Sequence, residues 1–158
     1  MTIYAIPFFI LYTLLSGALC WSDARSGLLP NRLTCPLLWS GLLFHLSLAP
    51  VDITDALWGV FAGYGFMAAL YWGYRGLYAR EGLGYGDVKY LAALGGWHGW
   101  QQLPVVLITA CVMAVTWWLS DAFWRRSAPD MKNPLPFGPF LGAAGFIVAG
   151  LAGLNLRL

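Results

Sequence analysis

The stretch YLAALGGWHGWQQLPVVLITACVMAVTWWLS, residues 90–120, contains no Asp, Glu, Lys or Arg in 31 positions. A helix that crosses a bilayer needs about 20 apolar residues, so this stretch is too long for one crossing. Its glycines, its polar residues and Pro104 gather in GGWHGWQQLP, residues 95–104, which is typical of a turn. The stretch therefore predicts two membrane-spanning helices joined by a short turn.

The whole chain shares this apolar character. Hydrophobic residues make up 59% of the 158 residues and charged residues only 10%, whereas a soluble globular domain has about 25% charged residues. Further charge-free stretches of membrane-spanning length cover residues 1–22, 33–51, 56–74 and 133–156. The composition argues against a soluble enzyme and predicts an integral membrane protein.

We predict an all-α fold: a polytopic integral membrane bundle of about six transmembrane helices, in a single membrane-embedded domain over residues 1–158. The first apolar stretch lacks the basic first region and the small-residue cleavage site of a signal peptide, so we expect it to remain as the first helix. The expected helices cover residues 3–21, 33–49, 56–74, 84–97, 104–123 and 138–156.

The basic residues predict the orientation, because cytoplasmic loops carry an excess of Lys and Arg. With the N-terminus outside, eight of the nine basic residues fall on the cytoplasmic side, and only Arg157 lies outside. The eight are Arg25, Arg32, Arg75, Arg80, Lys89, Arg125, Arg126 and Lys132. The opposite orientation would invert this count.

Three of the seven acidic residues fall at the cytoplasmic ends of expected helices; Asp121 is explained by an ion pair with Arg125, four residues on, which leaves Asp23 and Asp87. Asp23 follows the first apolar stretch, and Asp87 opens the fourth helix in GLGYGDVKY, residues 82–90. That helix is only about 20 Å long at 1.5 Å per residue, against a hydrocarbon core of about 30 Å, so we expect Asp87 at membrane depth. Each aspartate alone is explained as a helix cap or a juxtamembrane charge. The pair predicts a functional site, because ionisable groups inside a membrane are usually functional.

Two carboxyl groups held close together in a poorly solvated site share one proton. One then acts as a general base on water, while its protonated partner polarises a peptide carbonyl and later protonates the leaving amine. This is aspartic-protease chemistry, which needs no metal ion and no cofactor. Lys89, two residues after Asp87, is a candidate for tuning the pKa of that aspartate or for binding a lipid phosphate.

Other residues with possible chemistry have simpler explanations. The three cysteines form no CxxC pair, so neither a structural zinc site nor a disulfide framework is predicted. His45 and His98 are expected toward the outer side, which suits packing rather than a proton relay to the aspartates. Small residues such as Gly59 and Gly63 are expected to allow close packing of helices.

Three blocks of the sequence resemble the type IV prepilin peptidase family and occur in that family's order. GYGD, residues 84–87, fits the GxGD signature of membrane aspartic proteases. SDARSGLLPNRLTCPLLWSGLLFHL, residues 22–46, is similar to the block around the family's first catalytic aspartate. LPFGPFLGAAG, residues 135–145, resembles the family's closing Pro/Gly motif. GxGD alone is a weak signal, whereas the set of three is specific.

The resemblance implies a membrane aspartic endopeptidase whose catalytic residues are Asp23 and Asp87. Such enzymes cut prepilins and type II secretion pseudopilins after a glycine, between a short basic leader and an apolar helix, at the cytoplasmic face of the bacterial inner membrane. The family's structural positions correspond to Pro30, Gly84, Gly86, Gly138, Pro139 and Phe140.

Two departures from the family pattern bear on this expectation. Many members carry an additional N-terminal region with cysteine pairs that supports N-methylation of the product. The resemblance here covers the protease core alone, so N-methyltransferase activity is not expected. Members also commonly have acids where this chain has Arg25 and Asn31. The loss of two negative groups bears on contact with a basic leader, and hence on substrate range rather than on chemistry.

Two other classes of function remain open from the sequence. A catalytically silent membrane assembly factor would bind pilin-like helices in the same groove without cutting them. A transporter using the aspartates as a proton site would need polar residues across the bilayer, whereas the first and fourth helices are expected to be apolar beyond the inner face. The predicted partners are a prepilin or pseudopilin and membrane lipids, with no nucleic acid. The sequence predicts no oligomeric state.

Overall fold

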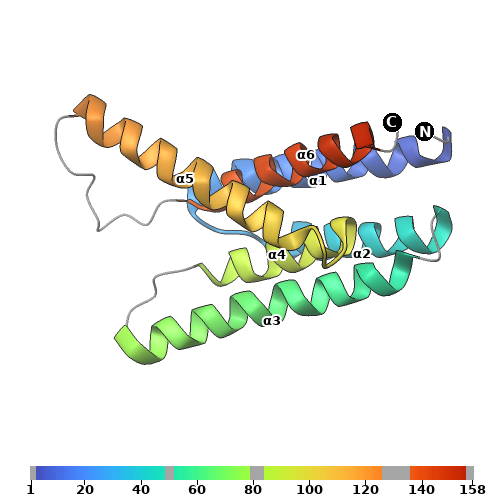
Figure 1. Ribbon diagram of the computed structural model, residues 1–158, viewed down its shortest axis with the longest axis horizontal. Coiled ribbons are helices and arrows are strands. Elements are labelled where there is room, and N and C mark those ends of the chain that lie inside the picture. Colours follow the sequence, from blue (N-terminus) through green and yellow to red (C-terminus); the bar gives the residue numbers. More distant parts are fainter. Residues whose placement is uncertain (1–2, 49–51, 79–83, 126–135, 156–158) are drawn as a thin grey trace.

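The computed structural model describes residues 3–48, 52–78, 84–125 and 136–155. Within these ranges the chain forms six α-helices and a 3-10 turn, Ile3–Ala5, and no β-strand (Figure 1). The predicted all-α membrane bundle is therefore confirmed. The helices are α1 (Ile6–Ser26), α2 (Asn31–Leu48), α3 (Ile53–Tyr78), α4 (Tyr85–His98), α5 (Leu103–Arg125) and α6 (Gly138–Asn155).

Three helices, α1, α3 and α5, continue past their predicted ends, because charged residues do not end them; α5 continues past residue 123 to Arg125. α3 continues past Arg75 to Tyr78, and α1 continues past residue 21 to Ser26. α1 ends where Gly27 adopts a φ of 62°, a left-handed conformation that glycine accepts without steric cost. The N–H of Gly27 donates a 2.8 Å hydrogen bond to the carbonyl oxygen of Asp23. Asp23 therefore belongs to the last turns of α1 instead of following the helix.

α4 is the short central helix of the bundle. α2, α3, α5 and α6 pack against it (Figure 1), and side chains of α1 reach it. Ten of its 14 residues are buried. A helix that is apolar on all its faces is stable only when other elements cover it, and the small and apolar residues of α4 fit this requirement. Because α4 lies at the centre, Asp87 in its first turn is buried inside the bundle.

Glycines bring the backbone of α3 into contact with the backbone of α4. A Cβ atom on Gly59 would overlap the carbonyl oxygen of Gly95, and a Cβ atom on Gly95 would overlap that of Gly59. At Gly63 an added Cβ would lie 3.0 Å from the carbonyl oxygen of Leu91. Small residues allow membrane helices to approach this closely. The packing role predicted for Gly59 and Gly63 is confirmed.

Consecutive helices run in opposite directions. Tyr90 near the start of α4 contacts Ser16 of α1, whereas His98 at the end of α4 lies beside Tyr12, so α1 and α4 are antiparallel. The start of α1 and the end of α6 lie together at one end of the bundle (Figure 1). The end of α1 and the starts of α4 and α6 therefore meet at the other end, which we call the aspartate end because it holds Asp23 and Asp87.

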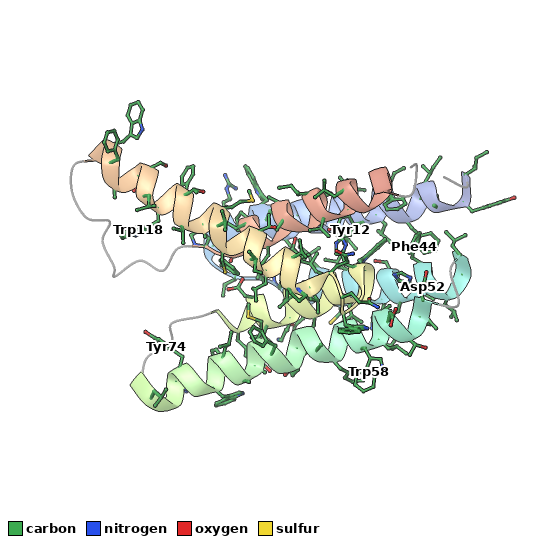
Figure 2. The ribbon with its side chains drawn as sticks, in the orientation of Figure 1. Tyr12, Phe44, Asp52, Trp58, Tyr74 and Trp118 are labelled. Carbon is green, nitrogen blue, oxygen red and sulfur yellow. The ribbon has the colours of Figure 1, made fainter. Side chains whose placement is uncertain are left out.

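Three helices are long and apolar enough to cross a membrane, over Ile3–Ser26, Ile53–Leu77 and Leu103–Trp124, and α6 has a shorter apolar stretch. Large hydrophobic side chains cover the outside of the bundle. Trp58 is 62% exposed on the outer side of α3, whereas Tyr12 is 3% exposed in the interior (Figure 2). An extensive apolar exterior is typical of a membrane protein. Four basic residues used to predict the orientation, Arg80, Arg126, Lys132 and Arg157, lie outside the described residues.

Candidate active site

Asp23 is buried near the C-terminal end of α1, with 5% of its surface exposed. Its Oδ2 atom accepts a 2.8 Å hydrogen bond from the backbone N–H of Gly138, the first residue of α6. The first N–H groups of a helix have no partner within the helix, so the start of α6 has a donor available for this carboxylate. A Cβ atom at residue 138 would lie 2.7 Å from the same oxygen. The contact therefore requires glycine.

Asp87 lies in the first turn of α4 and is 6% exposed. Its backbone N–H donates a 3.0 Å hydrogen bond to the carbonyl oxygen of Gly84, the N-cap residue directly before the helix. A Cβ atom on Gly84 would lie 3.2 Å from Oδ2 of Asp87, and one on Gly86 would lie 2.7 Å from Cβ of Leu29. The two glycines of GYGD thus make room for the carboxylate and for the loop between α1 and α2.

The interface between α1 and α4 brings the two aspartates together. Tyr90 of α4 contacts both Ser16 and Cys20 of α1. Asp87 precedes Tyr90 by three residues on α4, and Asp23 follows Cys20 by three residues on α1. Because the helices are antiparallel, both steps lead about 4.5 Å toward the same end of the bundle. The two carboxyl groups are close enough to interact electrostatically. Two residues 64 positions apart in the sequence, 23 and 87, thus share one buried site.

The two prolines of the motifs lie at the starts of the neighbouring helices. The carbonyl oxygen of Pro30 accepts hydrogen bonds from the N–H groups of Leu33 and Thr34, at 3.0 and 3.2 Å, in the first turn of α2. Pro139 is the second residue of α6, where the missing N–H of proline is tolerated. Phe140 follows it and packs against the core. Both prolines therefore begin helices that border the aspartate end.

The side chain of Lys89 is bound to the start of α2. Its Nζ atom donates a 2.8 Å hydrogen bond to Oδ1 of Asn31 and lies 4.9 Å from the centre of the Tyr85 ring. Successive residues of a helix are about 100° apart, so Lys89 lies about 200° around α4 from Asp87. The lysine therefore joins the start of α4 to the start of α2. Its influence on the pKa of Asp87 stays a prediction.

Metal-ligating side chains are not clustered in the part of the chain that the structure describes: no three His, Cys, Asp or Glu residues there are arranged to hold an ion. The histidines contact aromatic residues far from the aspartates. His45 Nε2 lies 3.1 Å from the carbonyl oxygen of Trp97, and His98 Nε2 lies 3.4 Å from Tyr12 Oη. The predicted packing role of both histidines is confirmed, and the two carboxyl groups carry the candidate chemistry.

Comparison with known proteins identifies the family. The sequence profile of the type IV leader peptidase family matches residues 8–119, a range that includes both Asp23 and Asp87. The chain belongs to the type IV leader peptidase family. No solved structure matches it.

The curated relatives compared with this chain differ in how much of their own length it covers. Leader peptidase HopD of Salmonella typhimurium is 54% identical over 143 residues, which are 90% of this chain and 92% of the relative. Leader peptidase HopD of Escherichia coli is 55% identical over 143 residues, which are again 90% of this chain and 92% of the relative. The prepilin leader peptidase/N-methyltransferase of Aeromonas salmonicida is 44% identical over 138 residues, which are 87% of this chain but 47% of that relative. The chain thus matches most of the shorter relatives and about half of the longer one.

A cluster of polar side chains, one turn inside the aspartates, was not predicted. Tyr90 Oη lies 2.5 Å from Ser16 Oγ and 3.8 Å from Cys20 Sγ, and both Tyr90 and Ser16 are fully buried. Gly142 of α6 closes the cluster, since a Cβ atom there would overlap Cys20 Sγ and lie 2.7 Å from Tyr90 Oη. The expectation that α1 and α4 are apolar beyond the aspartates is wrong at this interface.

One sequence signal for this cluster existed. Ser16, Cys20 and Asp23 follow one another at spacings of four and three residues, which places them on one face of α1. Nothing in the sequence around Tyr90 indicates that its hydroxyl reaches this face. Only the packing of α4 on α1 brings the Tyr90 hydroxyl to Ser16 and Cys20.

Proposed function

We propose that this protein is an aspartic endopeptidase that removes the basic leader from prepilins or type II secretion pseudopilins by cutting after a glycine. The observation that carries the proposal is the pair of buried aspartates, Asp23 and Asp87, at one end of a helical bundle that belongs to the leader peptidase family. The substrate class is supported by the name of the Aeromonas salmonicida relative, a prepilin leader peptidase/N-methyltransferase.

The proposed reaction uses the shared proton of the two carboxyl groups. The ionised carboxylate takes a proton from water, and the water oxygen adds to the carbonyl carbon of the scissile peptide bond. The protonated carboxyl donates a hydrogen bond to the carbonyl oxygen, which stabilises the developing negative charge. The carbon–nitrogen bond then breaks, and the leaving amine takes up a proton from the pair. Water is the only co-reactant, so we propose no cofactor.

The glycines of the GYGD motif support the proposal that a peptide can reach the aspartate pair. Gly84 is exposed, and it lies directly beside the buried carboxyl group of Asp87. A residue without Cβ permits close approach of an extended backbone. A substrate whose apolar helix lies in the membrane can therefore present the peptide bond that precedes this helix to the aspartate end.

We propose that the aspartate end faces the cytoplasm of a bacterial inner membrane, with the N-terminus outside. The five described basic residues all belong to helix ends at the aspartate end: Arg25, Arg32, Arg75, Lys89 and Arg125. In the sequence, no Lys or Arg lies between Arg32 and Arg75 or between Lys89 and Arg125, the segments that include the turns at the other end. Basic residues concentrate on the cytoplasmic side of membrane proteins, which supports this orientation.

We propose peptidase activity without N-methyltransferase activity. The chain spans 92% of the Salmonella typhimurium relative, whose name includes leader peptidase alone, and 47% of the Aeromonas salmonicida relative, whose name includes both activities. The aspartate pair is within the shared part, as expected if the peptidase chemistry resides there.

Cleavage of a co-expressed prepilin, read as a mobility shift of the pilin, tests the proposal. We expect wild type to cut and both Asp23→Asn and Asp87→Asn to fail at equal membrane abundance, because each removes an ionisable group at nearly constant volume. Asp52→Asn is the matched control, since Asp52 is an exposed aspartate at the opposite end of the bundle, and it should cut normally.

Two outcomes would contradict the proposal. If either active-site variant cuts at the wild-type rate, that aspartate is not catalytic. If wild type cuts no prepilin or pseudopilin but co-purifies with them, the protein is instead a silent assembly factor that binds pilin-like helices.

A further inference from the structure

A groove between α2, α3 and α4 lies away from the aspartate pair. Its volume is about 280 Å³, and its lining includes Thr34, Cys35 and Leu38 of α2, Phe61 and Tyr64 of α3, and Lys89 of α4. Because Lys89 is about 200° around α4 from Asp87, the groove opens on the opposite face of this central helix. It is therefore a second site, separate from the one that holds the carboxyl groups.

The groove has a cationic, polar end. Lys89 Nζ donates to Asn31 Oδ1 at 2.8 Å, and Tyr64 Oη lies 2.6 Å from Tyr85 Oη beside it. An ammonium group has three N–H donors, so Lys89 can bind an anion while it keeps its bond to Asn31. All of these groups come from the starts of α2 and α4 and the facing part of α3. The polar end of the groove is thus directed to the aspartate end of the bundle.

The rest of the groove is apolar apart from one hydroxyl. Leu38 lies one turn deeper along α2 than Thr34, and Phe61 lies almost one turn deeper along α3 than Tyr64. Thr34 is 2% exposed, and its Oγ1 atom has no hydrogen-bond partner among the described residues. Buried hydroxyl groups nearly always have a partner, because an unpaired one is costly. This hydroxyl is covered by protein in the wall of the groove, so the groove offers a ligand its cationic end and its apolar surface.

We propose that this groove binds one anionic phospholipid. The phosphate lies on Lys89, and an acyl chain lies along Leu38 and Phe61. An anionic headgroup is favoured because basic side chains near a membrane surface attract anionic lipids. A transmembrane helix of a substrate is about 10–12 Å across and is too wide for a groove of this volume, whereas an acyl chain fits. The proposal concerns lipid binding alone and does not depend on proteolysis.

Binding of phosphatidylglycerol to the purified full-length protein in detergent, measured by native mass spectrometry, tests this site. Lys89→Gln should weaken binding about fivefold, the contribution of one lysine beside an anionic lipid. Asn31→Asp should also weaken it, because its carboxylate would pair with Lys89 and repel the phosphate. Arg32→Gln is the matched control: it removes an exposed positive charge one residue from Asn31, outside the groove, and should bind as wild type does. Equal loss in Lys89→Gln and Arg32→Gln, or no loss in Lys89→Gln, would overturn the proposal.

Alkylation of Cys35 by N-ethylmaleimide gives a second measurement, with Cys111 as an internal control. Both thiols are exposed, but only Cys35 lines the groove, and Cys111 lies on α5. Phosphatidylglycerol should slow the labelling of Cys35 and leave Cys111 unchanged, whereas phosphatidylcholine should protect Cys35 less. Protection by inorganic phosphate alone would indicate a free anion site, and protection only by a synthetic prepilin helix would indicate a substrate site. Either result would refute the phospholipid proposal.

Discussion

Gly138 and Asp23 are 115 positions apart in the sequence, and the backbone N–H of the first donates a 2.8 Å hydrogen bond to Oδ2 of the second. The bond joins the start of α6 to the last turns of α1. An added Cβ on Gly138 would meet the carboxyl oxygen at 2.7 Å and the Asp23 Cβ at 3.0 Å. The closing Pro/Gly motif therefore acts directly on one of the two proposed catalytic groups.

Gly138→Ala should displace the Asp23 carboxyl group and lower the rate of prepilin cleavage by about 10²-fold, the usual cost of misplacing a catalytic group by about 1 Å. The measurement is kcat/KM on a prepilin, at matched amounts of folded protein. Gly17→Ala on α1 is the control, because nothing lies within 4 Å of a Cβ added there. Equal rates in Gly138→Ala and wild type would show that the hydrogen bond does not position Asp23.

The shared-proton mechanism predicts a bell-shaped dependence of kcat/KM on pH. At low pH both carboxyl groups are protonated, so no base remains to activate water. At high pH both are ionised, so no acid remains to protonate the leaving amine. The two apparent pKa values belong to the pair rather than to Asp23 or Asp87 alone. A rate that changes on only one side of the range, while circular dichroism shows intact helices throughout, would refute the shared proton.

The hydrogen bond between Ser16 and Tyr90 should contribute to stability. Tyr90→Phe leaves the buried Ser16 hydroxyl without this partner, so we expect a loss of about 1–3 kcal/mol in the free energy of unfolding. Unfolding of the reconstituted protein by detergent titration measures it. The double variant with Ser16→Ala should lose less than the sum of the single losses, by about 0.6 kcal/mol for a typical hydrogen bond in a membrane protein. Tyr4→Phe, at a 74% exposed position, is the control. Strict additivity would show that the two hydroxyl groups are energetically independent.

Gly95→Ala should loosen the contact between α3 and α4, because the added Cβ would overlap the backbone of Gly59. Overpacking of this kind typically costs about 1–3 kcal/mol of unfolding free energy. Thermal unfolding in detergent measures the loss. Gly65→Ala on α3 is the matched control, since its Cβ would meet no atom within 4 Å, and alanine is favoured over glycine in a helix. A Gly95→Ala protein as stable as wild type would show that the two helices can separate without cost.

Much of the architecture followed from the sequence because the bilayer limits the possible structures. Low charge and five long apolar stretches predicted a membrane bundle, and GGWHGWQQLP predicted the turn between α4 and α5, which the structure places at Gly99–Gln102. Helix ends were less predictable. The charged residues predict helix ends at residues 21 and 74, whereas a helix backbone continues past charged side chains until its geometry is interrupted, as it is at Gly27.

The candidate site, like the fold, was only partly predictable from the sequence. Asp23 and Asp87 were predictable because acidic residues are rare in this chain and both lie at one end of expected helices. Their surroundings were not predictable: the Gly138 N–H, the Ser16–Tyr90 pair and the bond from Lys89 to Asn31 each join different helices. Such contacts depend on how each helix is rotated about its axis, and the low amphipathicity of nearly uniformly apolar helices contains little information on this rotation.

The sequence by itself determined that the protein lies in a membrane, how many helices it forms, and which two acids have a chemical role to be tested. Only the tertiary structure decided what surrounds those acids and that a separate groove lies on the opposite face of α4. The physical reason is that helix formation and membrane insertion depend on local composition. The placement of one side chain against another instead depends on close contacts, such as those at Gly59, Gly95 and Gly138, between segments far apart in the chain.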